Sequence, residues 1–365
     1  MQGPFEPNPA GAQRAMTRSL DSRTAFLYHR SEEVCMDRYT IVIENVQHVG
    51  MLVGETVRMG NVTIAPVPLH LIDYLGSSGT AAVVEVMAGT DQEARGLAAL
   101  LLDEAITVLT FALCRQALVE GQGCPFGDLG MVMGISGQTD ECSAVRAWRR
   151  QAQSLTLDSP DDDSGRVLVI QSASVRALPR LEGGNLARFL SEPATQTLVQ
   201  IMNKHFGGHG DRVQNEYAES IAFAATCLRH SMESEPPHDL LDAVAGLEAL
   251  FTPRKKDPMF YPIAAMVGYG VAYTCPDRND PSVRLATWKE VKGLYGTRSR
   301  LVHGDRLANG VPTGVSRVER MLVESIEFCL SHGRMILACQ GIPNWLDMAR
   351  FGFPEAVGTQ AKLAR

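Results

Sequence analysis

The chain has 365 residues, enough for two domains of ordinary size, each with its own core. Hydrophobic residues make up 45% and charged residues 21%, as in a globular protein, and the net charge is −7. This acidic balance argues against indiscriminate binding to nucleic acid. No contiguous apolar run reaches the ~18 residues that a membrane span needs. The N-terminus also lacks a signal-peptide stretch, so we expect a cytoplasmic protein that makes no contact with a membrane.

The eight cysteines are scattered, with no C-x-x-C pair and no cluster at zinc spacing. A disulfide framework is not expected in a cytosolic chain of this size. His205 and His209 have H-x-x-x-H spacing, but the two glycines between them keep them from sharing a helix face. Cys124 lies in a Gly-rich loop without the ending of a phosphate-binding loop, and we interpret it as an incidental thiol. The sequence predicts no metal site and no cofactor.

The first half mixes strands and helices. Residues 1–15, rich in Pro and Gly, are interpreted as a flexible lead-in, and 16–193 as a mixed α/β domain of unknown role. The segment Thr90–Glu93 has a capping-box pattern and opens a long helix. Residues 154–165, with three consecutive Asp, are expected to form a turn or loop. Runs rich in Val and Ile predict strands at 39–46, 62–71, 81–87 and 166–170.

After Pro193 the pattern becomes helical. Apolar residues recur at spacings of three and four, and Pro or Gly separates the repeats. Short connections between such helices favour an antiparallel bundle over 194–345, followed by a tail at 346–365. The fold class is therefore α+β, a mixed N-terminal domain followed by an all-α domain. Helices are expected at 195–205, 212–232, 239–251, 262–273, 287–303 and 315–340.

Two stretches resemble a known family. Asp242–Phe251 has the sequence DAVAGLEALF, and residues 294–304 have the sequence LYGTRSRLVHG. Together they resemble the Apea-like HEPN family. The resemblance covers 194–345 and implies a helical bundle that usually dimerises, with an Arg-x4–6-His element that often forms an endoribonuclease site. Here that element is Arg298 to His303. Arg23 and His29 have similar spacing but lack the flanking pattern.

The chemistry of RNA cleavage without metal requires residues of these types. A base must activate the ribose 2′-hydroxyl, and fixed positive charge must stabilise the phosphate oxygens in the transition state. An imidazole accepts a proton near neutral pH, so His303 is the candidate base. Arg298 offers a planar fork of donors that matches phosphate. Ser299 and Arg300 are candidate substrate-binding residues. The segment 284–306 is locally basic, because it contains six Lys/Arg and two acids.

Each of these residues also has a structural interpretation. Arg298 could be the ion-pair partner of Glu248, which otherwise lies in an apolar stretch and would be costly to bury alone. Tyr295 is expected to pack in the bundle, and Glu248 and Tyr295 are both assigned a supporting role. Arg300 could be a plain surface charge, and His303 a helix-end residue. Five residues turn a helix by ~500°, so the side chains at 298 and 303 emerge roughly 140° apart. They can share a site if the helix end bends or if a second copy completes it.

The sequence thus leads us to expect a metal-independent endoribonuclease that acts on RNA as a homodimer, with a defence or stress role implied by the resemblance. A non-catalytic RNA-binding or dimerisation module is the alternative. A third, weaker hypothesis makes the first half a small-molecule enzyme, although no catalytic constellation in 1–190 supports it.

Overall fold

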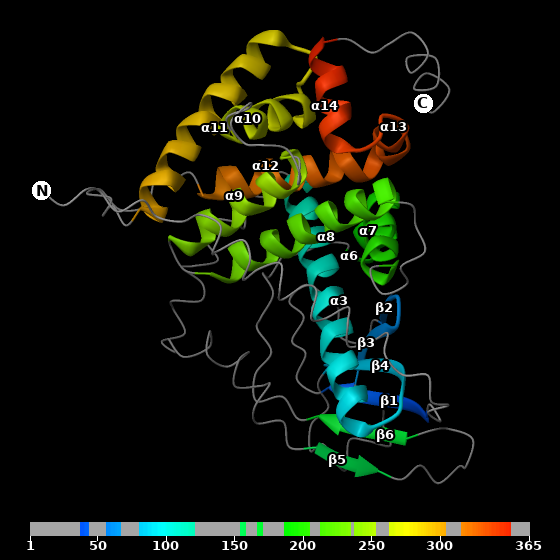
Figure 1. The fold of residues 1–365 in the computed structure, drawn as a ribbon. Coiled ribbons are helices and arrows are strands. Elements are labelled where there is room, and N and C mark those ends of the chain that lie inside the picture. The colour runs from blue at the N-terminus through cyan, green and yellow to red at the C-terminus, as the bar shows by residue number, and fades with distance from the viewer. Residues whose placement is uncertain are drawn as a thin grey trace, which may run out of the picture.

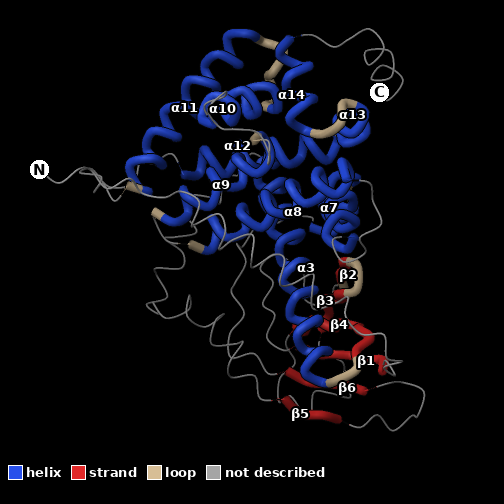
Figure 2. The backbone as a smooth tube through the Cα atoms, in the orientation of Figure 1, coloured by secondary structure: helices blue, strands red, loops and turns tan. Residues whose placement is uncertain are grey.

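The structure is a computed structural model of the whole chain. It describes residues 37–43, 56–66, 80–120, 154–157, 166–170, 186–204, 212–234, 237–252, 263–303 and 315–351. The described residues are mostly helical, with one small sheet, so the mixed α+β class is confirmed. The sheet and the helical bundle lie at opposite ends of the molecule (Figures 1 and 2).

The sheet has six strands in the order β2-β3-β4-β1-β6-β5. β1 pairs with β6 in parallel, and all the other neighbours are antiparallel. Alternate residues such as Tyr39 and Ile41 are fully buried, as expected for a strand with one face on the core. The strands are β1 (Asp37–Ile43), β2 (Val57–Met59), β3 (Val62–Pro66), β4 (Thr80–Ala88), β5 (Ser154–Leu157) and β6 (Arg166–Ile170).

One long helix, α3 (Asp91–Glu120), joins the sheet to the bundle. It begins where the sequence predicts, since the Thr90 hydroxyl accepts a hydrogen bond from the Glu93 N–H at 3.2 Å. The Glu93 carboxylate accepts in turn from the Gly89 N–H at 3.0 Å. Its first turns pack on β4, and later turns pack on helices of the bundle (Figure 1).

The segment Asp91–Val119 of α3 is long and apolar enough, by length and composition, to cross a membrane. In the structure 61% of its most apolar stretch is buried inside the protein. Two buried arginines connect this helix to the bundle. Arg115 forms ion pairs with Glu192 and Glu327, and Arg229 pairs with Asp103 at 2.7 Å. The helix predicted within 16–193 is therefore part of the bundle core as well.

The bundle contains the remaining helices. They share one apolar core, to which α8, α9 and α12 contribute fully buried side chains such as Ile221, Phe251 and Leu322. They are α6 (Leu186–Ser191), α7 (Pro193–Lys204), α8 (Arg212–Glu233), α9 (His238–Phe251), α10 (Ile263–Thr274), α11 (Pro281–Val302), α12 (Val315–Ser331), α13 (Gly333–Ala338) and α14 (Ile342–Phe351).

Three sequence-based expectations about elements were wrong. The segment 154–157, expected to be loop, is strand β5, because β6 supplies its hydrogen-bonding partner. The helix predicted at 287–303 starts six residues earlier, since Pro281 occupies its first turn and Asp280 caps it. The single helix predicted at 315–340 is interrupted at His332, which caps α13.

The predicted domain limits can be compared with the ends of the helices. The limit between 193 and 194 falls after the first residue of α7, which begins at Pro193, two residues after the end of α6 at Ser191. The predicted C-terminal tail starts inside α14, whose Leu346 is 1% exposed and packs in the core. The predicted loop at 121–130, His205, His209, Cys124 and the Arg23–His29 pair lie outside the described residues.

Candidate functional site

The candidate site lies at the C-terminal end of α11. The Asp280 side chain caps the other end by accepting from the Ser282 N–H at 2.7 Å. Although α11 has 22 residues, it has three buried ones (Thr287, Val291 and Thr297), because it packs mainly on α10 and touches α9. It runs along the outer edge of the bundle, away from the sheet (Figure 1).

Arg298 faces α9. Its guanidinium lies 3.3 Å from one oxygen of Glu248 and 3.4 Å from the other. The Tyr295 hydroxyl donates a hydrogen bond to the same carboxylate. The structure therefore contains the Glu248–Arg298 ion pair of the structural interpretation, with Tyr295 bonded to the same carboxylate. With 29% and 22% of their side chains exposed, Arg298 and Glu248 are half-buried, not sealed.

The environment of Tyr295 keeps it neutral. Burial, together with the hydrogen bond to Glu248, raises the pKa of the Tyr295 phenol above its ordinary value. Its ring lies 5.4 Å from the guanidinium carbon of Arg298. The three side chains thus form one polar junction between α9 and α11, with the arginine held from two sides.

His303 lies on a different face of the helix and is exposed. Its backbone stays close to helical, with φ −81° and ψ 3°, and its N–H donates to the Ser299 carbonyl at 3.1 Å. The helix end therefore does not bend His303 back toward Arg298, and the ~140° between the two positions persists. Within one chain the two residues of the predicted pair point to different surroundings.

The residues that share a face with His303 are Ser299 and Arg300, four and three positions earlier. Ser299 is half-exposed and Arg300 is exposed. Helical spacing puts these two predicted substrate-binding residues on the same side of α11 as His303, and Arg298 pairs with Glu248. Within one chain a phosphate at His303 would meet Arg300 first.

The basic segment predicted from the sequence is the surface of α11. Of its two acids, Glu290 pairs with Arg317 of α12 at 3.2 Å, and Asp305 lies outside the described residues. Lys289, Lys292 and Arg300 are exposed, and none has an acidic partner among the described residues. Lys292 instead lies 5.0 Å from the centre of the Trp288 ring. Because no acid in the described ranges neutralises these cations, their positive charge acts on the solvent around α11.

Lys289 and Lys292 belong to the basic segment predicted from the sequence, but no individual role was predicted for them. Counting back from His303 in steps of three and four reaches 300, 296, 292, 289 and 285, a helical stripe that the sequence already contains. The stripe was missed because nothing in the sequence says which face of the helix is covered.

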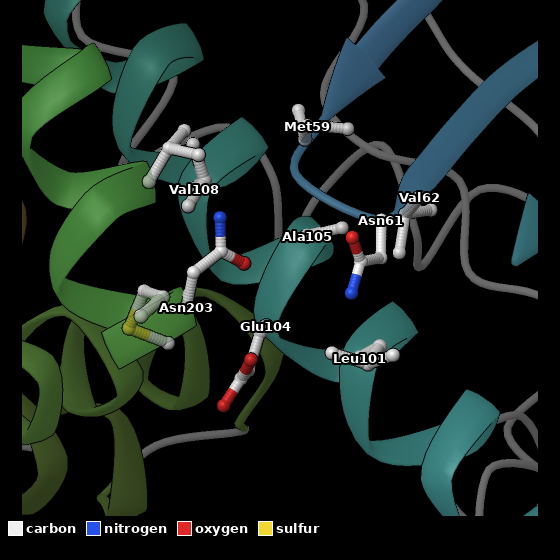
Figure 3. A pocket seen from close by; sticks show the side chains of 10 residues that line it. Met59, Asn61, Val62, Leu101, Glu104, Ala105, Val108 and Asn203 are labelled. Carbon is white, nitrogen blue, oxygen red and sulfur yellow. The ribbon is translucent and has the colours of Figure 1, made fainter. Parts of the chain in front are cut away.

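A second feature lies between the sheet and the bundle. A partly open space of about 10 Å³, room for a single water, is lined by residues of the β2–β3 turn, α3 and α7. Asn61, Glu104 and Asn203 are its polar residues, and Figure 3 shows the two asparagine side chains facing this space. Burial raises the pKa of Glu104 to about 8. The space lies where the sheet meets the bundle, and it is too small for a substrate.

Among the residues that the structure describes, no group of three or more His, Cys, Asp or Glu is placed to hold a metal ion. The cysteines in the described ranges are buried. Burial raises the pKa of two of these thiols, Cys227 and Cys329, to about 12, so they remain neutral core residues.

Comparisons of the chain with family models, with curated proteins and with solved structures find no match. The fold itself defines the class: a mostly helical α+β protein whose peripheral basic helix ends in an exposed histidine.

Proposed function

We propose that this protein is a metal-independent endoribonuclease of the HEPN type. The observation that carries the proposal is the exposed imidazole of His303 at the end of a helix on which Lys289, Lys292 and Arg300 have no acidic partner among the described residues. A base that reaches solvent and a positive field around it are the two requirements of this reaction. The resemblance of 294–304 to the family motif supports the same activity.

The reaction needs a proton acceptor and a phosphate-binding cation. His303 removes the proton of the ribose 2′-hydroxyl, whose oxygen attacks the adjacent phosphorus. The bond from phosphorus to the 5′-oxygen breaks, and that oxygen takes a proton from the imidazolium or from water. The products are a 2′,3′-cyclic phosphate and a 5′-hydroxyl end. A guanidinium stabilises the non-bridging oxygens as they gain charge.

In this proposal Arg298 reaches the phosphate of a site that a second copy of the chain completes. The reason is geometric: Arg298 faces Glu248, and the straight end of α11 directs His303 elsewhere. A two-fold dimer joins the Arg298 of one copy to the His303 of the other. The cytoplasmic location, the homodimer and a defence or stress role belong to the same proposal and rest on the resemblance.

One observation favours the alternative, a non-catalytic RNA-binding or dimerisation module. Glu248 and Tyr295 give Arg298 a structural role that needs no substrate. If the role of Arg298 is only to pair with Glu248, then Arg298 does not bind phosphate and His303 lacks its catalytic partner.

The test is cleavage of a labelled single-stranded RNA by the purified protein in EDTA. We expect products with 2′,3′-cyclic phosphate ends, and we expect His303→Ala to abolish cleavage without changing the melting temperature. His238→Ala, which removes another exposed histidine at the start of α9, is the matched control and should cleave like the parent. RNA binding without cleavage by the parent would instead assign the module.

A further inference from the structure

The outward face of α11 carries one continuous row of residues, which we call the α11 ridge. It consists of Leu285, Lys289, Lys292, Gly296, Arg300 and His303, at spacings of three and four. Every one of the six is exposed. Because side chains three and four apart lie above one another on a helix, the ridge is a single line along the edge of the bundle.

The ridge is positive and open. Its three cations have no acidic partner among the described residues, in a chain whose net charge is −7. A Cβ added at Gly296 would meet nothing within 4 Å, so a ligand can approach the backbone there. Acids at i±3 or i±4 from a lysine would neutralise part of its charge and stabilise the helix slightly. The ridge has no such acids.

A second copy of the chain does not suit the row of cations from Lys289 to Arg300, and the contact of the proposed dimer is confined to the helix end at His303. Two ridges facing each other across a two-fold axis would place lysines and arginines of like sign in contact, which disfavours association. A polyanion removes that cost. From Lys289 to His303 the ridge rises over 14 residues, or ~21 Å, which is the length of roughly six nucleotides of a stacked strand at ~3.4 Å each.

We infer that the α11 ridge is the track along which a single strand of RNA lies, with its phosphates on Lys289, Lys292 and Arg300. The inference deepens the proposed function and rests on it for the identity of the polyanion. The cations form a single row along one helix, and a single strand presents its phosphates in a single row as well. The strand then passes Arg300 immediately before His303, so Arg300 contacts the phosphate next to the imidazole.

The test measures binding separately from cleavage. The probe is a labelled single-stranded 2′-O-methyl RNA, which lacks the attacking hydroxyl, and the reading is fluorescence anisotropy in EDTA. The variant is Lys289→Gln/Lys292→Gln. The matched control is Arg38→Gln/Arg58→Gln, which removes two exposed cations from the sheet at the other end of the molecule (Figure 1).

For single strands each phosphate contact contributes a slope of about −0.7 to log K against log salt, or about fivefold in affinity at 0.1 M salt. The ridge variant should therefore bind about 25-fold more weakly and lose about 1.4 from the slope, and the control should bind like the parent. Equal weakening in both variants, or in neither, overturns the inference. So does displacement of the probe by polyglutamate as readily as by RNA, which would assign an acidic protein segment.

A glycine pair provides a variant that leaves every native side chain in place. Gly296→Glu adds an acid to the ridge, and Gly96→Glu adds one to α3, where an added Cβ also meets nothing within 4 Å. We expect weaker RNA binding for the first and parental binding for the second. If Gly296→Glu changes the oligomeric state in light scattering and leaves RNA binding intact, the ridge is a contact between copies and the inference fails.

The two proposals can fail separately. If the ridge variants lose binding but the parent does not cleave RNA, the track stands and the nuclease fails. If the parent cleaves RNA and the ridge variants cleave it with an unchanged KM, the nuclease stands and the track is wrong.

Discussion

Glu319 gives the sharpest prediction about stability. This residue of α12 is 2% exposed, and one of its carboxylate oxygens is buried with no hydrogen-bond partner among the described residues. Burial, with a contribution from the charge of Asp239, raises the pKa of Glu319 from 4.5 to about 8. The folded protein therefore holds a proton that the unfolded chain releases. We predict that Glu319→Gln, which keeps the shape without the charge, stabilises the protein at high pH.

The magnitude follows from linkage. Below pH 4.5 both states are protonated and Glu319 costs nothing. As pH rises from 4.5 toward 8 the unfolded state ionises first, so the free energy of unfolding falls by about 1.4 kcal/mol per pH unit. The accumulated cost at pH 8 is on the order of 5 kcal/mol at most. Above pH 8 the folded state ionises as well, and the slope vanishes.

The assay is urea denaturation of the parent and Glu319→Gln at intervals between pH 4.5 and 8. The two free energies of unfolding should be similar at pH 4.5 and diverge by several kcal/mol, in favour of the variant, by pH 8. Glu290→Gln, at the surface, is the control and should stay within about 0.5 kcal/mol of the parent. A difference between Glu319→Gln and the parent that does not change with pH would refute the reasoning.

Three further predictions concern α11, which carries the candidate site, and its neighbours α9 and α10. Glu248→Gln should lower the free energy of unfolding by about 1–3 kcal/mol, seen in urea melts, because Arg298 loses its carboxylate while half-buried. Gly296→Ala should raise it by up to about 1 kcal/mol, since the new Cβ meets nothing and a helical glycine is removed. Gly270→Ala should lower the melting temperature by several degrees, because its Cβ would lie 2.1 Å from the Phe251 ring. An unchanged melt for Glu248→Gln, or a stabilised Gly270→Ala, would contradict the packing described.

Local patterns predicted the local structure well. The capping box at Thr90 and the strand at 166–170 occur as expected, because each depends on neighbours in sequence. The Glu248–Arg298 pair was also predictable, since an acid in an apolar helix needs a cation and the motif supplied one. These signals are present in the sequence before any tertiary contact forms.

Tertiary arrangement accounts for the remaining differences. The parallel pairing of β1 with β6 joins segments more than a hundred residues apart, and β5 exists because β6 lies beside it. Whether His303 and Arg298 face the same way depends on where α11 ends and on what covers it. The spacing of five residues sets the angle between the two side chains if the helix continues. The position of α9 then determines that Arg298, and not His303, is covered.

The central claim is that the 2′-hydroxyl of RNA is the nucleophile and His303 its base. The most direct measurement uses a DNA oligonucleotide with a single ribonucleotide, incubated with the protein in EDTA. We predict one cut, on the 3′ side of that ribose, which disappears when its 2′-hydroxyl is methylated or when His303 is replaced by Ala. Cleavage that survives either change, or no cleavage of any ribose by the parent protein, would contradict the account.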